Sequence, residues 1–306
     1  MLARCAAFKP IVTVVAHPCD EASLRGAHEA AQAGLIVPIL VGPEAKIRAT
    51  AAAAGLDIGA WRLVATPHSH AAAAEAVRLV RAGEAEMLMK GSLHTDELMH
   101  EVAAGETGLR TARRISHAYV MDVPRYPRPL MITDAAINIF PTLDDKRDIC
   151  QNAIELAHAL GIPLPKVAIL SAVETVSAKL PSTIDAAALC KMADRGQITG
   201  GMIDGPLAFD NAISLTAARE KGIVSPVAGQ ADILVVPDLE AGNMLAKQLT
   251  FLAGADAAGI VLGGRVPIVL TSRADTVRTR LASCAVALIL AEARRRRAAA
   301  GGGDSA

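Results

Sequence analysis

Residues 11–16 read Ile-Val-Thr-Val-Val-Ala, a short apolar run of mostly β-branched residues that predicts a buried strand. An alanine-rich helical pattern follows at residues 21–33 and ends at Gly34, and a second apolar run occupies residues 36–41. A strand, a helix and another strand in this order are typical of a parallel sheet with crossover helices. The beginning of the chain therefore predicts an α/β fold.

The same alternation continues to the end of the chain. Further strands are predicted at residues 87–89, 131–133, 167–170, 233–236, 259–261 and 268–270. Further helices are predicted at residues 44–54, 70–81, 146–160, 182–195, 241–253 and 274–298. A chain of 306 residues is long enough for two lobes, and its 52% apolar but only 2% aromatic content predicts tightly packed α/β layers rather than an all-β sandwich.

The charge and cysteine content exclude several classes of protein. Lys plus Arg and Asp plus Glu are equal at 31 each, so no overall field favours nucleic acid or an anionic membrane. Five widely spaced cysteines and eight scattered histidines give neither a disulfide framework nor a metal site. No stretch has the length of a signal peptide or a membrane span. We expect a reduced cytoplasmic protein, and we read the four arginines 294–297 as a solvated helix end rather than a polyanion patch.

The segment 89–95, Met-Lys-Gly-Ser-Leu-His-Thr, is the first candidate site, because a glycine loop after a strand is where parallel sheets hold ligands. Lys90 supplies a charge for a phosphate, and Gly91 lets the backbone approach a ligand. Ser92 and Thr95 supply hydroxyls that serve either an anion or the cap of the next helix. A phosphate site and an ordinary capped loop both remain open here.

A second group of polar residues interrupts apolar sequence. Asp134 and Asn138 lie at the end of the predicted strand 131–133, and Asn211 follows a Gly-Pro pair within residues 203–211. Partly buried polar groups must find partners, which makes these residues candidates for substrate binding in a cleft. The alternative is a satisfied turn, because Asp and Asn often bond their own backbone.

The segment 266–276 is the most informative, because a buried strand ends there in hydroxyl, guanidinium and carboxylate groups. Arg273 is suited to binding a phosphate bidentately, and Ser272 to bonding an oxyanion. Asp275 is expected in the first turn of the next helix, as a cap or as a base. Ser-x-x-Asp is also a capping pattern, but an arginine is a costly choice for a cap alone, so we favour a catalytic site.

Six segments of the chain, taken in order, resemble the phosphate acetyltransferase and phosphate butyryltransferase family. They are residues 89–95, 133–141, 170–183, 204–214, 237–247 and 267–275. The resemblance covers nearly the whole chain and lies nearer the butyryl-type branch. It extends to the transferase part of longer bifunctional enoyl-CoA hydratase/phosphate acetyltransferase proteins, whose hydratase domain does not precede this sequence. A stand-alone transferase is expected.

The resemblance implies a two-lobed fold like that of isocitrate and isopropylmalate dehydrogenases, with mixed or parallel sheets, an interlobe cleft and a homodimer. Lobe I is expected at residues 1–143 plus 264–306, and lobe II, the dimerisation lobe, at residues 144–263. The family's Ser-Arg pair, which contacts the acyl phosphate, corresponds to Ser272 and Arg273. The family's aspartate base in the acetyl-type branch falls where this chain has Thr279, so the base is open between Asp275 and another group.

The expected reaction is reversible transfer of a short-chain acyl group between coenzyme A and inorganic phosphate, with CoA as substrate and no permanently bound cofactor or metal. Direct attack by the CoA thiolate needs no enzyme nucleophile, although Cys150 and Cys284 keep an acyl-cysteine route open. A non-catalytic CoA-binding or acyl-phosphate-binding protein is the first alternative. An NAD(P)-dependent dehydrogenase on the same fold is weaker, because no Gly-x-Gly-x-x-Gly follows the first strand.

Overall fold

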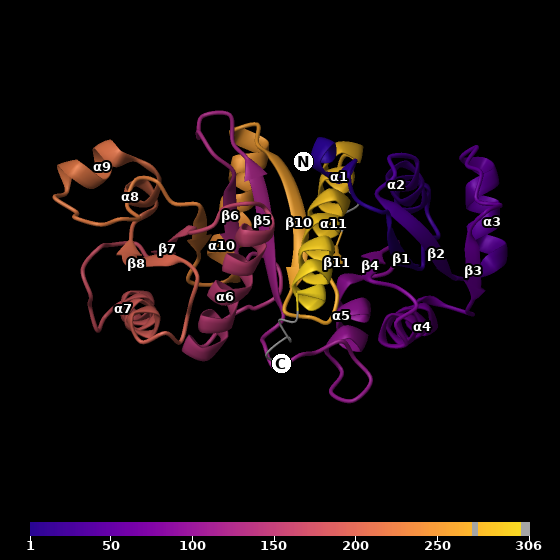
Figure 1. Cartoon of the computed structure of the whole chain (residues 1–306), viewed down its shortest axis with the longest axis horizontal. Helices are drawn as coiled ribbons and strands as arrows, with labels where there is room; N and C mark the ends of the chain where they lie inside the picture. The colour runs from indigo at the N-terminus through magenta and orange to yellow at the C-terminus, as the bar shows by residue number, and fades with distance from the viewer. Residues whose placement is uncertain (271–274, 301–306) are drawn as a thin grey trace. The chain divides into compact units, whose positions relative to one another are not determined.

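The computed structural model of the protein describes residues 1–270 and 275–300. These residues form two compact units, of which unit 1 comprises Met1–Arg113 and the described residues from Ala258 onward, and unit 2 comprises Arg114–Ala257. Each unit contains a sheet flanked by helices (Figure 1). The α/β class predicted from the sequence is confirmed.

Unit 1 is built on a mainly parallel sheet with the strand order β3-β2-β1-β4-β11-β10. The strands are β1 (Ile11–Ala16), β2 (Ile36–Gly42), β3 (Arg62–Ala65), β4 (Met87–Lys90), β10 (Asp256–Leu262) and β11 (Ile268–Val269). Strand β10 is antiparallel to β11, whereas β1, β2, β3, β4 and β11 pair in parallel. The carboxyl ends of β1, β4 and β11 therefore meet at one edge of the sheet.

The helices of unit 1 are α1 (Leu2–Cys5), α2 (Glu21–Gln32), α3 (Glu44–Ala53), α4 (Ser69–Arg81), α5 (Thr95–Ala103) and α11 (Val277–Ala299). Helix α2 begins directly after the loop that follows β1, and the Asp20 carboxylate caps it by accepting a 2.8 Å hydrogen bond from the Ser23 N–H. Short connections of this kind bring helix starts to the same edge as the strand ends, where parallel sheets place ligands.

Unit 2 has a sheet with the order β5-β6-β9-β7-β8. Its strands are β5 (Ser116–Asp122), β6 (Leu130–Thr133), β7 (Lys166–Leu170), β8 (Met202–Leu207) and β9 (Ile233–Val235). Only the pair β5 and β6 is antiparallel among these neighbours. Its helices are α6 (Leu143–Ala159), α7 (Pro181–Asp194), α8 (Phe209–Ile213), α9 (Leu215–Glu220) and α10 (Leu239–Leu252).

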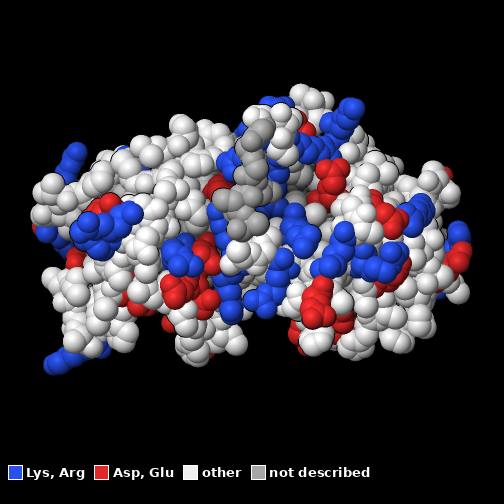
Figure 2. All heavy atoms as spheres, turned by 60° about the horizontal axis from the view of Figure 1, so that its bottom comes forward, with Lys and Arg blue, Asp and Glu red and all other residues white. Residues whose placement is uncertain are grey.

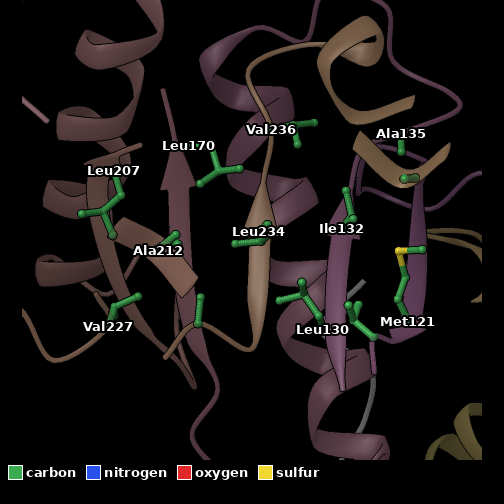
Figure 3. Close-up of a cluster of buried hydrophobic side chains, with 14 of the residues drawn as sticks. Met121, Leu130, Ile132, Ala135, Leu170, Leu207, Ala212, Val227, Leu234 and Val236 are labelled. Atoms are coloured by element: carbon green, nitrogen blue, oxygen red, sulfur yellow. The ribbon is translucent and has the colours of Figure 1, made fainter. Parts of the chain in front are cut away.

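Aliphatic side chains fill the core of unit 2. Ile132, Leu234 and Leu170 project from three successive strands of the sheet and are buried together with Leu207 and Val236 (Figure 3). Their burial supplies the main driving force for folding, since removing each such side chain from water contributes roughly 1.5–3 kcal/mol. This core consists of the residue types that the low aromatic content predicts.

The boundaries between the units differ from the predicted lobe boundaries. Residues 114–143 were expected in lobe I, but they lie in unit 2, because β6 pairs with β9 in the same sheet as β7 and β8. Residues 258–263 were expected in lobe II and lie in unit 1, because β10 pairs with β11. The dimerisation role of residues 144–263 stays a prediction.

Charged side chains of both signs are interspersed on the surface. Figure 2 shows acidic side chains beside basic ones in several places on the visible face. Ion pairs such as Arg62–Glu84 at 2.7 Å join side chains of opposite charge. Within the described residues, no helix combines the length and apolarity needed to cross a membrane.

Candidate active site

Hydrogen bonds join the loops after β1 and β4 at the carboxyl ends of the unit 1 strands. Ala16 and Lys90 are register partners, and the Gly91 and Ser92 N–H groups donate to the carbonyls of Ala16 and His17 at 2.8 and 2.9 Å. A Cβ atom on Gly91 would lie 2.6 Å from the His17 oxygen and still closer to that of Ala16. Glycine is therefore required here to let the two backbones approach, as the sequence predicted for a glycine in this loop.

The hydroxyl of Ser92 joins the two loops through its side chain. Ser92 Oγ donates to the His17 carbonyl at 2.8 Å, accepts from the Cys19 N–H at 3.2 Å and lies 3.1 Å from His17 Nδ1. His17 itself adopts a left-handed backbone conformation with φ of 54°. Ser92 thus holds the His17 imidazole at the carboxyl end of β1.

Lys90 is buried directly beneath this loop. Its Nζ donates to the carbonyls of Gly91 and Leu93 at 3.2 and 3.0 Å, and the residue is only 8% exposed. These bonds hold the ammonium group at the end of β4. Its role as a phosphate partner stays a prediction.

The hydroxyls of Ser92 and Thr95 do not cap the helix after this loop. Helix α5 begins at Thr95, its N-cap is His94, and no side chain forms a cap hydrogen bond there. The capping alternative considered for this segment is therefore not realised. Thr95 is exposed in the first turn of α5, and its role in binding phosphate stays a prediction.

The third predicted segment contains β11, the neighbour of β4. Val269 is the register partner of Met89, so β11 ends beside the strand that leads into Lys90. Ser272 and Arg273 lie outside the described residues. Asp275 precedes α11 rather than lying in its first turn, because Thr276 is the N-cap and accepts a 3.2 Å hydrogen bond from the Thr279 N–H. The predicted position of Asp275 in the first turn of the helix was wrong, because α11 begins at Val277.

Asp134 and Asn138 lie together in unit 2, in the loop after β6. The Asp134 carboxylate accepts hydrogen bonds from the N–H groups of His117, Ala136, Ile137 and Asn138, and from Asn138 Nδ2 at 2.6 Å. Asn138 Nδ2 also donates to the Ile115 carbonyl at 2.9 Å, and its Oδ1 accepts from Arg114 at 2.7 Å. Both residues are almost completely buried, so they organise this loop; contact with substrate stays a prediction.

Asn211 makes its contacts elsewhere in unit 2. It is completely buried on α8, and its Nδ2 donates to the Glu174 carboxylate, which also pairs with Lys221 at 2.5 Å. The bond from Lys221 lowers the pKa of Glu174. The three candidates of unit 2 therefore fall into two places: Asp134 and Asn138 in one loop, and Asn211 in a separate polar cluster.

The cysteines are poorly suited to a covalent role. Burial raises the pKa of Cys150 and of Cys284 to about 12, and both side chains are completely buried. Cys19 lies in the loop after β1, where burial, despite Lys46, raises its pKa to about 11. Because the thiolate is the nucleophile, thiols that stay protonated at neutral pH disfavour an acyl-cysteine route.

His17 is the member of this site that the sequence analysis missed. It follows β1 directly, at the edge where the strand carboxyl ends meet, and that position was the available signal. Burial lowers the pKa of the imidazole, and Lys46 lowers it further, whereas Glu97 and Asp20 oppose the shift. The carboxyl ends of the unit 1 strands thus combine a buried ammonium, two loops that approach closely at Gly91, and a neutral imidazole. This arrangement is suited to an anionic substrate and a proton transfer.

Comparison with known proteins agrees with this chemistry. Residues 69–288 match the family model described as "Phosphate acetyl/butaryl transferase". A phosphate acetyltransferase of Rhizobium meliloti is 72% identical over 294 residues, covering 96% of this chain and 93% of the relative. A phosphate butyryltransferase of Clostridium acetobutylicum is 43% identical, covering 93% of this chain and 94% of the relative.

Solved structures support the same relationship. A branched-chain phosphotransacylase from Enterococcus faecalis superposes with a TM-score of 0.81 at 31% identity, covering 92% of this chain and 99% of that one. A 4-hydroxythreonine-4-phosphate dehydrogenase from Klebsiella pneumoniae has a TM-score of 0.57 at 13% identity over 93% of this chain and 99% of that one, a likeness of fold alone. The predicted dehydrogenase-like fold is confirmed.

The chain belongs to the phosphate acetyl/butyryl transferase family, as the resemblance in its six segments indicated. It is an acyltransferase that acts in reversible phosphate acyl transfer.

Proposed function

We propose that this protein transfers an acetyl group between coenzyme A and inorganic phosphate, by direct attack of the CoA thiolate on acetyl phosphate in a ternary complex. The observation that carries the proposal is the 72% identity to a phosphate acetyltransferase across 96% of the chain. The butyryltransferase relative is only 43% identical. We therefore favour the acetyl group, although the resemblance of the six segments lies nearer the butyryl-type branch.

The proposed chemistry divides among the residues at the strand ends of unit 1. Arg273 and Ser272 bind the acyl phosphate, as the family resemblance implies, and the buried Lys90 ammonium adds positive charge at the end of β4. The Ser272 hydroxyl, assigned to the oxyanion from the sequence, stabilises that oxyanion as the thiolate adds to the carbonyl. A well-placed donor of this kind contributes roughly 3–4 kcal/mol. The raised thiol pKa values of Cys19, Cys150 and Cys284 favour direct transfer over an acyl-enzyme.

The partners follow from this chemistry. CoA or acyl-CoA, and phosphate or acyl phosphate, are substrates that leave after each turnover, and no permanently bound cofactor is required. We place the reaction in the cytoplasm, where the CoA and phosphate substrates occur and thiols stay reduced. We also propose that the chain forms a homodimer through unit 2, where α10 exposes Met244, Phe251 and Leu252.

The test is release of free thiol from acetyl-CoA, propionyl-CoA and butyryl-CoA, each with and without phosphate. The wild type is expected to release thiol only with phosphate and to prefer acetyl-CoA. Arg273→Ala is expected to lower kcat/KM by about 100-fold or more, because it removes a charged partner of the phosphoryl group. Arg265→Ala, which alters an exposed arginine before β11, serves as the matched control and is expected to be unchanged.

The same assay separates this proposal from its alternative. Binding of CoA without phosphate-dependent thiol release from any acyl-CoA would establish the non-catalytic binding protein instead. Equal activity of wild type and Arg273→Ala would overturn the role given to Arg273 while leaving the transferase function in place.

A further inference from the structure

The hydrogen bonds of Ser92 determine which nitrogen of His17 carries a proton. A serine hydroxyl has one hydrogen and two lone pairs, and Ser92 donates that hydrogen to the His17 carbonyl at 2.8 Å, since a carbonyl only accepts. With the Ser92 hydrogen on the shorter of its two contacts, the 3.1 Å contact with Ser92 Oγ is donated by His17 Nδ1–H. The second lone pair of Oγ takes the Cys19 N–H at 3.2 Å. Neutral His17 consequently has its lone pair on Nε2.

The surroundings of His17 keep this imidazole neutral. Among the described residues, the charged groups that shift its pKa are Lys46 on α3, Glu97 on α5 and Asp20 at the start of α2. Burial together with Lys46 outweighs the two carboxylates and holds the pKa of His17 below its ordinary value of 6.5. At neutral pH the ring is therefore able to accept a proton.

The Nε2 atom is available for that proton. In the part of the chain that the structure describes, no hydrogen bond ends on Nε2, and Nε2 is not one of the buried atoms that lack a partner. Lys90 lies at the neighbouring strand end, in register with Ala16, so a positive charge is fixed beside the loop that holds His17. An acceptor nitrogen in the loop after β1, next to the strand that ends in Lys90, suits a substrate that brings both an acidic S–H and a phosphate.

We propose that His17 is a catalytic residue whose Nε2 accepts the proton of the CoA thiol, a role that rests on the proposed phosphate acyl transfer. The S–H bond breaks as Nε2–H forms, and the sulfur electron pair makes the new C–S bond to the carbonyl carbon. The bond between the carbonyl carbon and the phosphate oxygen then breaks. The departing phosphate takes the proton from Nε2, so the imidazole is regenerated and no further reactant is consumed.

This assignment answers the question that the sequence left open between Asp275 and another base. Two hydrogen bonds join Ser92 Oγ to His17, one at its carbonyl and one at Nδ1, and the Cys19 N–H in turn holds Ser92 Oγ, so the lone pair has a defined direction relative to the β1 and β4 loops. A positioned base of this kind contributes about 10²–10⁴-fold to a rate.

His17→Asn is the most informative variant. The Asn amide reproduces the Nδ1 donor to Ser92 but lacks Nε2, and Asn tolerates the positive φ of 54° at this position. His17→Gln is the second variant, because its amide reaches the place of Nε2 without providing a base. His100→Asn, which alters an exposed histidine on α5, is the matched control. Thermal unfolding of each variant verifies that it is folded.

The measurement is kcat for acetyl phosphate plus CoA between pH 6 and pH 9.5. We expect His17→Asn and His17→Gln to be about 100-fold slower at pH 7, with His100→Asn unchanged. The deficit should shrink as the pH passes about 8.5, because solvent then ionises the thiol and the base is no longer needed. Should one variant fail to fold, the other carries the same expectation.

A deficit in both folded variants that stays constant with pH would overturn the base role, because loss of packing or binding has no reason to follow thiol ionisation. Wild-type rates in His17→Asn, or a pH-dependent deficit found in Asp275→Asn instead, would overturn it as well. In these cases the wild type still transfers acyl groups, so the proposed function stands. Absence of transfer by the wild type would refute that function, and the role of His17 with it.

Discussion

Gly91 sets how closely the loops after β1 and β4 approach, and its substitution should cost stability. In Gly91→Ala the added Cβ would meet the backbone oxygens of Ala16 and His17, which cannot rotate away. We expect a loss of about 1–3 kcal/mol in the free energy of unfolding, measured by urea denaturation. Gly105→Ala is the control, since nothing lies within 4 Å of the Cβ it would add. An equal effect of the two substitutions would refute the close approach as the cause.

His117 should make the protein less stable in mild acid. Its side chain is 2% exposed, and burial lowers its pKa to about 4, although Asp134 acts in the opposite direction. The unfolded chain takes up a proton near pH 6.5 and the folded chain does not, so stability is complete above pH 6.5 and falls as the pH decreases toward 4. The expected loss across this window is on the order of 3 kcal/mol.

The measurement is the urea midpoint at several pH values from 7.5 to 4.5. His117→Phe keeps an aromatic ring against Tyr119, whose ring centre lies 4.5 Å from that of His117 in an edge-to-face contact. This variant should reduce the fall of the urea midpoint with decreasing pH. His100→Asn should leave the slope unchanged. A wild-type midpoint that does not fall below pH 6.5 would show that His117 is protonated in the folded state.

At the scale of elements, α6 shows how local sequence sets a helix start. Thr142 accepts from the Asp145 N–H at 3.2 Å, while the Asp145 carboxylate accepts from the Thr142 N–H at 3.0 Å, which forms a capping box. Thr142→Ala should therefore cost about 1 kcal/mol in urea denaturation. Thr199→Ala, at an exposed threonine of the same unit, should be neutral, and a similar cost at both positions would argue against the cap.

Elements with a clear local pattern were predicted well. The expected strand 11–16 matches β1, and the expected helix 21–33 matches α2 to within a residue. By contrast, Gly205 and Pro206, residue types typical of turns, lie inside β8. Strand β8 is at the edge of the unit 2 sheet, where a proline without an N–H is tolerated, and that position depends on tertiary structure that the local sequence does not encode.

The end of α11 shows a similar limit. Its arginines were expected to be solvated, and Arg296 and Arg297 are exposed, but Arg295 pairs with Glu86 at 2.6 Å and Arg294 donates to the carbonyl of Gly264 at 3.3 Å. Arg296 lies over the ring of Phe8, with its guanidinium carbon 5.3 Å from the ring centre. Because these partners are far away in the sequence, the run of arginines alone could not predict them.

The candidate site divides in the same way. Lys90, Gly91 and Ser92 were found because they follow a strand in one short segment. His17 was missed because its partner Ser92 is 75 positions away, and only strand pairing brings them together. Asp134 was recognised as a polar group needing partners, but the sequence could not show that backbone N–H groups would supply most of them.

At the scale of the whole molecule, the chain is expected to be a dimer assembled through unit 2. Met244, Phe251 and Leu252 recur on α10 at the spacing of one helix face and are 65%, 77% and 81% exposed. A single 31.6 kDa chain would leave this apolar surface in water, an unfavourable state that association removes. Sedimentation of the wild type should therefore give about twice the chain mass.

The double substitution Phe251→Glu and Leu252→Glu should produce monomers, because charges placed in a buried apolar contact would lack partners. Val224→Glu is the control, since Val224 is fully exposed in unit 2 outside α10. This variant should remain a dimer. Both side chains of the double variant are already exposed in the single chain, so its monomers should keep their fold and circular dichroism. A wild type that sediments as a monomer, or a double variant that stays dimeric, would place the contact elsewhere or remove it.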